Sequence, residues 1–280
     1  MAHWDGNWHS GQMTIHYNIC ELTDYISWPY FYHSWGMSGK AGTERERLRE
    51  EALELARSWD GRFKVHAKVK IVDANSDGDD IILSDGTRLP LLRQQNVASD
   101  GLPNLCLADF IRPQAQGIAD RLGFFATSVD AGMVSRCCCD CYDKMLAQTV
   151  ADRLAEAAAE KLHHYVRTQY WGYAPDEALS MADMLAGRYQ GIRPAAGYPS
   201  LPDMSINFVI DKVLGMGEIG IRLTESGMMQ PHASVSGLMF AHPQARYFDV
   251  GPIGKDQLSD YARRRGLPLE LVLRFLRRNY

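Results

Sequence analysis

The loop 189–199 has the composition of a ligand-binding segment and reads Tyr-Gln-Gly-Ile-Arg-Pro-Ala-Ala-Gly-Tyr-Pro. Prolines stiffen its backbone, while Gly197 lets a ligand approach the main chain closely. Arg193 offers a planar guanidinium that can grip a carboxylate through two parallel hydrogen bonds. The same residues would also form a rigid turn with a surface arginine, and the pattern alone does not decide between these two interpretations.

Four of the six cysteines lie in one short run, Cys137-Cys138-Cys139-Asp140-Cys141. A structural zinc site needs four tetrahedrally arranged ligands, usually from pairs spaced by two to four residues. Three adjacent cysteines cannot all face one ion without contorting the backbone. We therefore expect reduced, half-buried small residues at the start of a helix rather than a metal site.

Other conspicuous groups have weak support as reactive sites. Adjacent His163 and His164 would point about 100° apart on a helix, so they cannot share a ligand. The sequence contains no HExxH, P-loop or GxSxG motif, and zinc-protease, kinase, hydrolase and Rossmann chemistry are not expected.

The stretch 255–280 carries seven Lys or Arg against three Asp or Glu in a helix–glycine–helix pattern. Helix-turn-helix proteins share this pattern, but a solvated basic face is commoner, and we expect no nucleic-acid partner.

Composition indicates a folded protein. The chain has 280 residues, of which 46% are hydrophobic and 23% charged, which suffices for a large core and excludes a disordered chain. A formal net charge of −4 excludes a general polyanion binder. No stretch approaches the roughly 20 apolar residues that span a bilayer, and the first residues do not resemble a signal peptide. We expect a cytoplasmic protein without a membrane partner.

Apolar periodicity predicts the elements that must position the loop. The strongest helix is expected over 142–170, where apolar residues recur every four positions, and alternation over 63–71 predicts an antiparallel strand. The aromatic segment 25–35 is expected to pack on the body of the protein. Together the elements predict an α+β fold with an antiparallel sheet. Further helices are expected over 43–59, 206–215, 255–265 and 267–278, a turn over 75–79, and strands over 80–83, 88–92, 105–111, 123–129, 219–224, 233–240 and 247–250.

Several of these segments carry motifs that together resemble one known family. In chain order they are Leu92-Arg93-Gln94-Gln95, Cys106-Leu107-Ala108-Asp109-Phe110, Ala151-Asp152-Arg153-Leu154-Ala155-Glu156-Ala157, Tyr170-Trp171-Gly172-Tyr173-Ala174-Pro175, the loop 189–199, Leu223-Thr224-Glu225-Ser226, Ala233-Ser234-Val235-Ser236-Gly237, His242-Pro243 and Asp260-Tyr261-Ala262-Arg263-Arg264. From about residue 25 onward the chain resembles the C-terminal activation, or reactivation, domain of cobalamin-dependent methionine synthase. We expect an N-terminal extension over 1–24 and one activation-like domain over 25–280.

The resemblance implies a single C-shaped α+β domain around a central twisted antiparallel sheet flanked by helices. It also implies that the domain binds S-adenosylmethionine and holds its methyl group over a cobalamin carried elsewhere. Flavodoxin or another reductase supplies an electron to the oxidised, inactive cobalt, and methylation then makes the rescue irreversible. No side chain needs to act as base or nucleophile, because the protein contributes position and electrostatics.

The resemblance assigns roles to three charged or polar side chains. Arg193 matches the arginine that grips the carboxylate of S-adenosylmethionine. Glu156 and Tyr198 match residues near the sulfonium. A carboxylate at position 156 lies off the apolar stripe of its predicted helix, so it can face a cation at modest desolvation cost.

The adenosine end of the ligand is assigned in the same way. Tyr247 and Phe248 match an aromatic pair at that end. The backbone around Ala195 would complete the contact, and Gly197 belongs to the same binding loop. No residue is assigned as a metal ligand.

One position departs from the family pattern. At Ser27 the family usually has an aspartate, which pairs with the ammonium group of the ligand. Serine keeps a hydrogen-bond acceptor but loses the charge. A charge-assisted hydrogen bond contributes about 1.5–3 kcal/mol against about 1 kcal/mol for a neutral one, so the affinity is expected to be roughly tenfold lower.

The family's modules for homocysteine, folate and cobalamin have no counterpart in these 280 residues. We therefore expect a free-standing reactivation component of a split methionine synthase, which acts on a cobalamin-binding partner chain and cannot make methionine alone. Two alternatives stay open. The client could be another corrinoid methyltransferase, or the pocket could have decayed and left a docking module.

Overall fold

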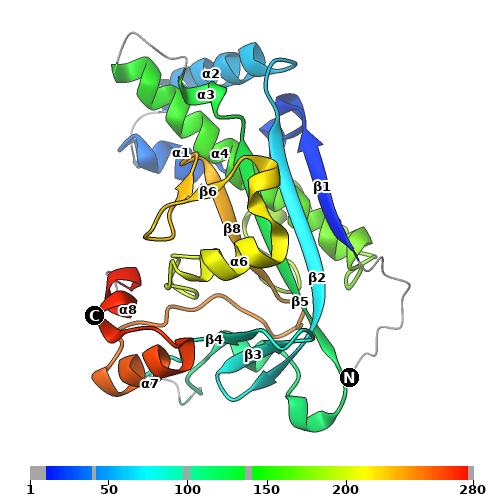
Figure 1. The fold of residues 1–280 in the computed structure, drawn as a ribbon. Helices are drawn as coiled ribbons and strands as arrows, with labels where there is room; N and C mark the ends of the chain where they lie inside the picture. Colours follow the sequence, from blue (N-terminus) through cyan, green and yellow to red (C-terminus); the bar gives the residue numbers. More distant parts are fainter. Residues whose placement is uncertain (1–10, 40–41, 97–100, 102, 136–140, 277–280) are drawn as a thin grey trace.

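A curled antiparallel sheet forms the centre of the molecule (Figure 1). The computed structural model describes residues 11–39, 42–96, 101, 103–135 and 141–276. The strands of the main sheet are β1 (Gln12–Tyr17), β2 (Val65–Asp77), β3 (Asp80–Leu83), β4 (Arg88–Pro90), β5 (Asp120–Val129) and β8 (Ser234–Met239). Their order is β4-β3-β2-β5-β8, with β1 pairing with the first half of β2. A separate small hairpin contains β6 (Arg222–Leu223) and β7 (Met229–Gln230).

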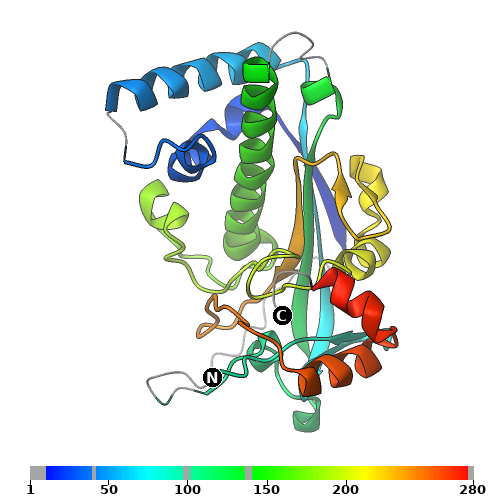
Figure 2. The same ribbon diagram turned by 90° about the vertical axis from the view of Figure 1, so that its left-hand side faces the viewer.

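Helices cover both faces of this sheet (Figure 2). They are α1 (Trp28–Ser34), α2 (Gly42–Trp59), α3 (Gly132–Ser135), α4 (Cys141–Tyr165), α5 (Met181–Leu185), α6 (Ile206–Leu214), α7 (Lys255–Arg265) and α8 (Leu269–Phe275). Helices α1, α2 and α4 lie on one face, and α6, α7 and α8 lie on the other. One core joins β1, β2 and β5 to α2 and α4, and a second joins β3, β5 and β8 to α6. The predicted α+β class with a central antiparallel sheet is confirmed.

Helix α4 carries one wall of the site. Its apolar stripe from Leu146 to Leu162 is buried, as the four-residue spacing predicts. Alanines between the stripe residues let the helix lie close to the sheet, and Thr127 Oγ1 of β5 donates a 2.9 Å hydrogen bond to the carbonyl of Ala155. The helix continues into one π-helical turn, Val166–Tyr170.

The aromatic segment before α2 packs on this face, as the sequence predicts. Phe31 is buried, and its ring meets that of Trp28 edge to face with centroids 5.4 Å apart. Trp28, Tyr32 and Trp35 all contact the core beneath α4. Burial of these rings fixes the start of α1 beside α4.

Two predicted strands are wrong. Residues 105–111 contain the 3-10 turn Leu107–Phe110, which closes because the Asp109 carboxylate accepts a 2.8 Å hydrogen bond from the amide of Cys106. Residues 247–250 form no strand, because the backbone of Phe248 is bonded to the Ser200 hydroxyl instead of to a neighbouring strand.

Other predicted elements are present with different boundaries. The strand predicted over 219–224 shrinks to the two residues of β6. Strand β2 runs six residues further than predicted, to Asp77, and the turn expected over 75–79 contracts to residues 78 and 79. The longer strand lets β2 pair with β1 near its start and with β3 near its end.

Strand β1 belongs to the main sheet. It runs antiparallel to β2, with Gln12 opposite Lys70 and Tyr17 opposite Val65. It lies in the stretch 1–24 that the sequence analysis sets apart as an extension. Residues 12–17 alternate between more exposed and more buried side chains, which is the pattern of a strand with one face on a core.

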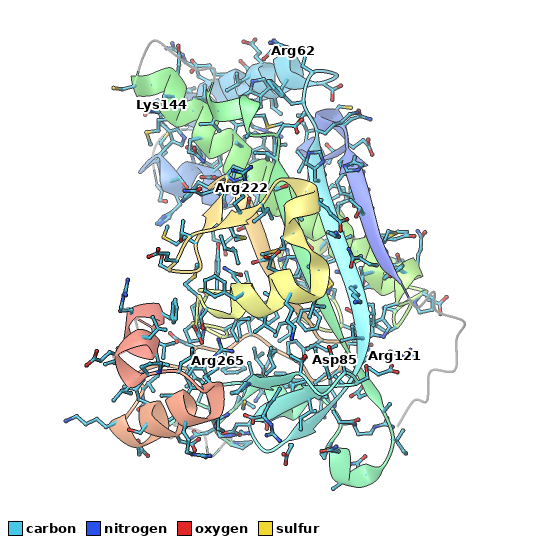
Figure 3. The ribbon with its side chains drawn as sticks, viewed as in Figure 1. Arg62, Asp85, Arg121, Lys144, Arg222 and Arg265 are labelled. Atoms are coloured by element: carbon cyan, nitrogen blue, oxygen red, sulfur yellow. The ribbon has the colours of Figure 1, made fainter. Side chains whose placement is uncertain are left out.

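The arginine cluster of α7 is held largely by carboxylates of this chain. Arg264 pairs with Asp260 at 2.7 Å and also with Asp80. Arg265, labelled in Figure 3, donates a 2.5 Å hydrogen bond to Ser205 Oγ and lies 3.5 Å from Asp203. These contacts fasten the C-terminal helices to the body of the domain.

Residues 215–220 have the spacing GxGxxG, which also occurs in dinucleotide-binding turns. It follows α6 and forms the 3-10 turn Met216–Ile219, whereas a dinucleotide-binding turn joins a strand to a helix. The spacing therefore does not indicate Rossmann chemistry. Within the described ranges, no helix is long and apolar enough to cross a membrane.

Candidate functional site

The loop 189–199 lies along the outer edge of β8 like an additional strand. Ile192 and Phe240 exchange two backbone hydrogen bonds of 3.0 and 2.9 Å. Further along, the amide of Ala196 donates a 2.9 Å bond to the carbonyl of Ser236. This pairing fixes the backbone around Ala195 against a rigid sheet, which is how a loop can present a side chain accurately.

Two glycines permit this close packing. Gly237 of β8 lies under the loop, and a Cβ atom there would overlap the carbonyl oxygen of Pro194. Gly197 has φ +85°, a conformation that L side chains rarely adopt, and a Cβ atom there would overlap Met204 Sδ. The predicted close approach of the loop backbone is thus made to the protein's own sheet and to Met204.

The side chain of Arg193 reaches from the loop to α4. Its Nη2 binds the Glu160 carboxylate, and the two side chains are only 17% and 7% exposed. Among the residues that the structure describes, Arg193 Nε and Glu160 Oε1 are buried without a hydrogen-bond partner. One donor and one acceptor thus remain side by side, which suits a ligand that carries both a carboxylate and an ammonium group.

Glu156 lies on α4, one helical turn before Glu160, and contacts Tyr198 of the loop. Tyr198 Oη donates a 3.1 Å hydrogen bond to Glu156 Oε1. The negative charge of Glu156, followed by burial, raises the pKa of Tyr198 to about 12, so the phenol stays protonated as a donor. Tyr198 is 53% exposed, so the pair borders open solvent.

Tyr247 and Phe248 approach the loop from the other side. Tyr247 Oη accepts a 3.0 Å hydrogen bond from the amide of Arg193, and its side chain is 49% exposed. Phe248 is half-buried, and its amide donates a 3.0 Å bond to the Ser200 hydroxyl just after the loop. Hydrogen bonds thus join four of the predicted site residues in two pairs, Arg193 with Tyr247 and Tyr198 with Glu156, which the loop and α4 carry side by side.

Ser27 lies on a separate segment at the N-terminal end of α1. It is half-buried, and its hydroxyl makes no capping hydrogen bond. Tyr25, two residues earlier, has its pKa raised by burial and then by the charge of Glu160, and the turn Thr23–Tyr25 contacts α4. Among the residues that the structure describes, Ser27 makes no hydrogen bond to another predicted site residue.

A further layer of buried groups supports the loop; the sequence indicated no role for Arg167 or Glu177 and considered His163 only as a ligand for a shared ion. Arg167 binds Glu177 through two hydrogen bonds of 2.7 and 2.6 Å, and its guanidinium lies 4.0 Å from the ring centroid of Tyr189. His163 contacts the same ring edge to face and lies 3.1 Å from Tyr173 Oη. Burial lowers the pKa of His163 well below its ordinary value, so it serves as a neutral packing group.

Two of the predicted site residues, Tyr198 and Tyr247, are exposed to solvent at the edge of the loop. Two hollows of about 370 and 380 Å³ lie elsewhere, one between α2 and residues 19–28 and the other beside β2, β3 and α6. In the described part of the chain, no group of three or more His, Cys, Asp or Glu side chains is arranged to hold a metal ion. Cys137, Cys138 and Cys139 lie outside the described residues, and Cys141 is a free, exposed thiol.

Comparison with known proteins agrees with this architecture. Residues 18–266 match the family model for the activation domain of vitamin B12 dependent methionine synthase. A crystal structure of the MetH reactivation domain bound to AdoHcy has a TM-score of 0.88 and 37% sequence identity, over 96% of this chain and 90% of that one. The chain therefore belongs to the family of vitamin B12 dependent methionine synthase activation domains. The resemblance drawn from the sequence motifs is confirmed.

Proposed function

We propose that this chain binds S-adenosylmethionine between α4 and the loop 189–199 and presents its methyl group for reductive methylation of cobalamin. The observation that carries the proposal is the buried Arg193–Glu160 pair with its unused donor and acceptor. Support comes from the 37% identical reactivation domain, which was crystallised with AdoHcy. In this proposal the chain is the reactivation component of a cobalamin-dependent methionine synthase.

Each end of the ligand has a complementary group. Arg193 binds the carboxylate, and Glu160 holds the guanidinium in place for it. Glu156, with Tyr198 as its hydrogen-bond partner, faces the positively charged sulfonium. The hydroxyl of Ser27 accepts a hydrogen bond from the ammonium group.

The nucleoside end lies toward the exposed aromatic side of the loop. Tyr247 and Phe248 pack against the adenosine, because aromatic rings offer flat apolar faces to a base. The backbone of Ala195 and Gly197, held against β8 and Met204, completes this end. None of these residues acts as a base or nucleophile; they position the ligand and balance its charge.

The exposure of Tyr198 and Tyr247 suits transfer to a second macromolecule. S-adenosylmethionine, when bound, supplies the methyl group, and cobalamin on a partner methionine synthase chain supplies the cobalt that accepts it. Flavodoxin or another reductase is the electron donor in this proposal. The chain's part is to hold the sulfonium beside the half-exposed Tyr198 and Tyr247, where a corrin ring can approach.

Titration calorimetry of the purified chain tests the proposal directly. We expect one binding site with micromolar-range affinity for S-adenosylmethionine and for S-adenosylhomocysteine. A second assay adds a cobalamin-loaded methionine synthase fragment and a reductant, and methylcobalamin should form only when chain and S-adenosylmethionine are both present. Absence of heat and of thermal shift, for the native chain and for Ser27→Asp alike, would overturn the proposal and leave a docking module.

Ser27→Asp is expected to tighten S-adenosylmethionine binding roughly tenfold, because a charge-assisted hydrogen bond to the ammonium group replaces a neutral one. Aspartate is also a favourable residue at the start of a helix, so α1 should not be weakened. Calorimetry with the native chain in parallel measures the change. Ser27→Ala is the matched control, and unchanged affinity in both variants would show that the ammonium group lies elsewhere.

Glu156→Gln is expected to separate the two ligands. Glutamine keeps an acceptor for Tyr198 Oη but removes the charge that faces the sulfonium. Affinity for S-adenosylmethionine should fall about tenfold, while affinity for S-adenosylhomocysteine, whose sulfur is neutral, should change little. Competition calorimetry compares the two constants on one sample, and an equal loss for both ligands would show that Glu156 does not face the sulfur.

A further inference from the structure

Strand β1 carries a histidine directly opposite a histidine of β2. His16 and His66 are register partners in the antiparallel ladder, so their side chains lie on the same face. Their Nδ1 atoms are 2.7 Å apart, and the rings are nearly perpendicular, at 83°, with centroids 4.9 Å apart. The two nitrogens therefore face one point between the strands.

One of these rings is oriented by a carboxylate. His66 Nε2 lies 3.0 Å from Asp130 Oδ1, and the second oxygen of Asp130 accepts a 2.8 Å hydrogen bond from the amide of Lys64. An ionised carboxylate only accepts, so His66 carries its proton on Nε2 and turns the Nδ1 lone pair toward His16. A histidine held in this way by a carboxylate is the usual arrangement around a metal ligand.

We propose that His16 and His66 form a two-histidine site for a divalent transition-metal ion, of the group Zn²⁺, Ni²⁺ and Cu²⁺ that imidazole nitrogens favour. The ion would replace the proton shared between the two Nδ1 atoms. That proton moves to Nε2 of His16, whose side chain is exposed to water. The ion is charge-balanced in part by Asp130, and water fills the remaining coordination positions.

The geometry requires only a small adjustment. Two nitrogens bound to one ion at about 2.0–2.1 Å lie roughly 2.9–3.4 Å apart for angles of about 90–110°, against 2.7 Å here. The exposed ring of His16 can make this movement. The neighbouring cation on the same face of β2, Lys68, is already bound to Glu218 at 2.6 Å, so its charge is balanced.

This site is independent of the S-adenosylmethionine proposal. His16 precedes the residues 18–266 that match the family, and it lies on β1, outside the loop and α4. In the described part of the chain no third His, Cys, Asp or Glu completes a ligand set. The expected consequence is local: a bound ion fastens β1 to β2 and stabilises the folded state by mass action.

Titration with Ni²⁺ tests the site, since this ion does not oxidise thiols. The parent protein for the test carries His3→Ala, His9→Ala and serine in place of Cys137, Cys138, Cys139 and Cys141, so that these groups cannot compete. We expect one Ni²⁺ per chain by calorimetry and a raised melting temperature. His16→Gln and His66→Gln should each weaken binding at least about tenfold, and Asp130→Asn by about tenfold.

The matched control is His33→Gln, which removes an exposed histidine of α1 and should leave Ni²⁺ binding unchanged. Circular dichroism and metal-free melting temperatures confirm that the variants are folded. His16→Gln is the deciding variant, because its side chain is exposed and the substitution leaves the core intact. Equal Ni²⁺ affinity in the parent and in His16→Gln, or no binding by the parent, overturns the proposal.

Discussion

Replacing Arg193 with methionine is expected to weaken binding of S-adenosylmethionine and of S-adenosylhomocysteine by at least about a hundredfold. The loss follows from two charge-assisted hydrogen bonds to the carboxylate, each contributing about 1.5–3 kcal/mol. Both ligands carry that carboxylate, so both should lose affinity alike, in contrast to Glu156→Gln. Calorimetry with the two ligands on one preparation measures the effect.

This substitution also disturbs the folded state, and the experiment must separate the two effects. Without Arg193, the Glu160 carboxylate is 7% exposed and unpaired, which destabilises a fold by about 3–5 kcal/mol. The double variant Arg193→Met/Glu160→Met removes both charges and should recover most of the stability while still failing to bind. A stable double variant that binds as tightly as the native chain would show that the carboxylate does not lie on Arg193.

Periodicity predicts those elements that bury one face. Helix α4 follows from apolar residues at every fourth position, and β2 follows from alternation, because each pattern places its apolar side chains on a single core. The apolar run 105–111 has no such pattern, and a short run does not distinguish a strand from a turn. The turn there depends on Asp109, which also binds Arg93 at 2.6 Å, sixteen residues away.

Strand β1 could have been found from the sequence. Met13, Ile15 and Tyr17 alternate with polar residues, which is the signal of a half-buried strand. What the sequence could not show is the pairing partner, because the register with β2 depends on a segment about fifty residues later.

The site was predictable in part. The composition of the loop indicates a binding segment with Arg193 in it but is equally compatible with a structural turn, and only the family resemblance assigns roles to the residues. Glu160 lies four residues after Glu156, so helical spacing does place both on one face of α4. Sequence spacing does not show that the guanidinium of Arg193, thirty-three residues away, binds Glu160. That contact exists because β8 holds the loop beside α4.

Glu177→Ala is expected to destabilise the domain by about 3–5 kcal/mol, because it leaves the Arg167 guanidinium buried without its counter-charge. Arg167 is fully buried and Glu177 is 6% exposed, so water cannot replace the lost bonds. For a chain of this size the melting temperature should fall by roughly 6–20 °C. Thermal unfolding followed by circular dichroism measures the shift.

The same substitution should reach the binding site through Tyr189. Its ring rests on the Arg167 guanidinium at the start of the loop, so a displaced Arg167 releases the loop that carries Arg193, and ligand affinity should fall although no ligand contact is removed. The control is Arg188→Ala, which breaks an ion pair with Asp183 whose arginine is 72% exposed and should cost less than about 1 kcal/mol. Equal losses in the free energy of unfolding for both substitutions would show that the buried Arg167–Glu177 pair stabilises the fold no more than an exposed ion pair does. A destabilised Glu177→Ala protein with native affinity would show that the loop is held by β8 alone.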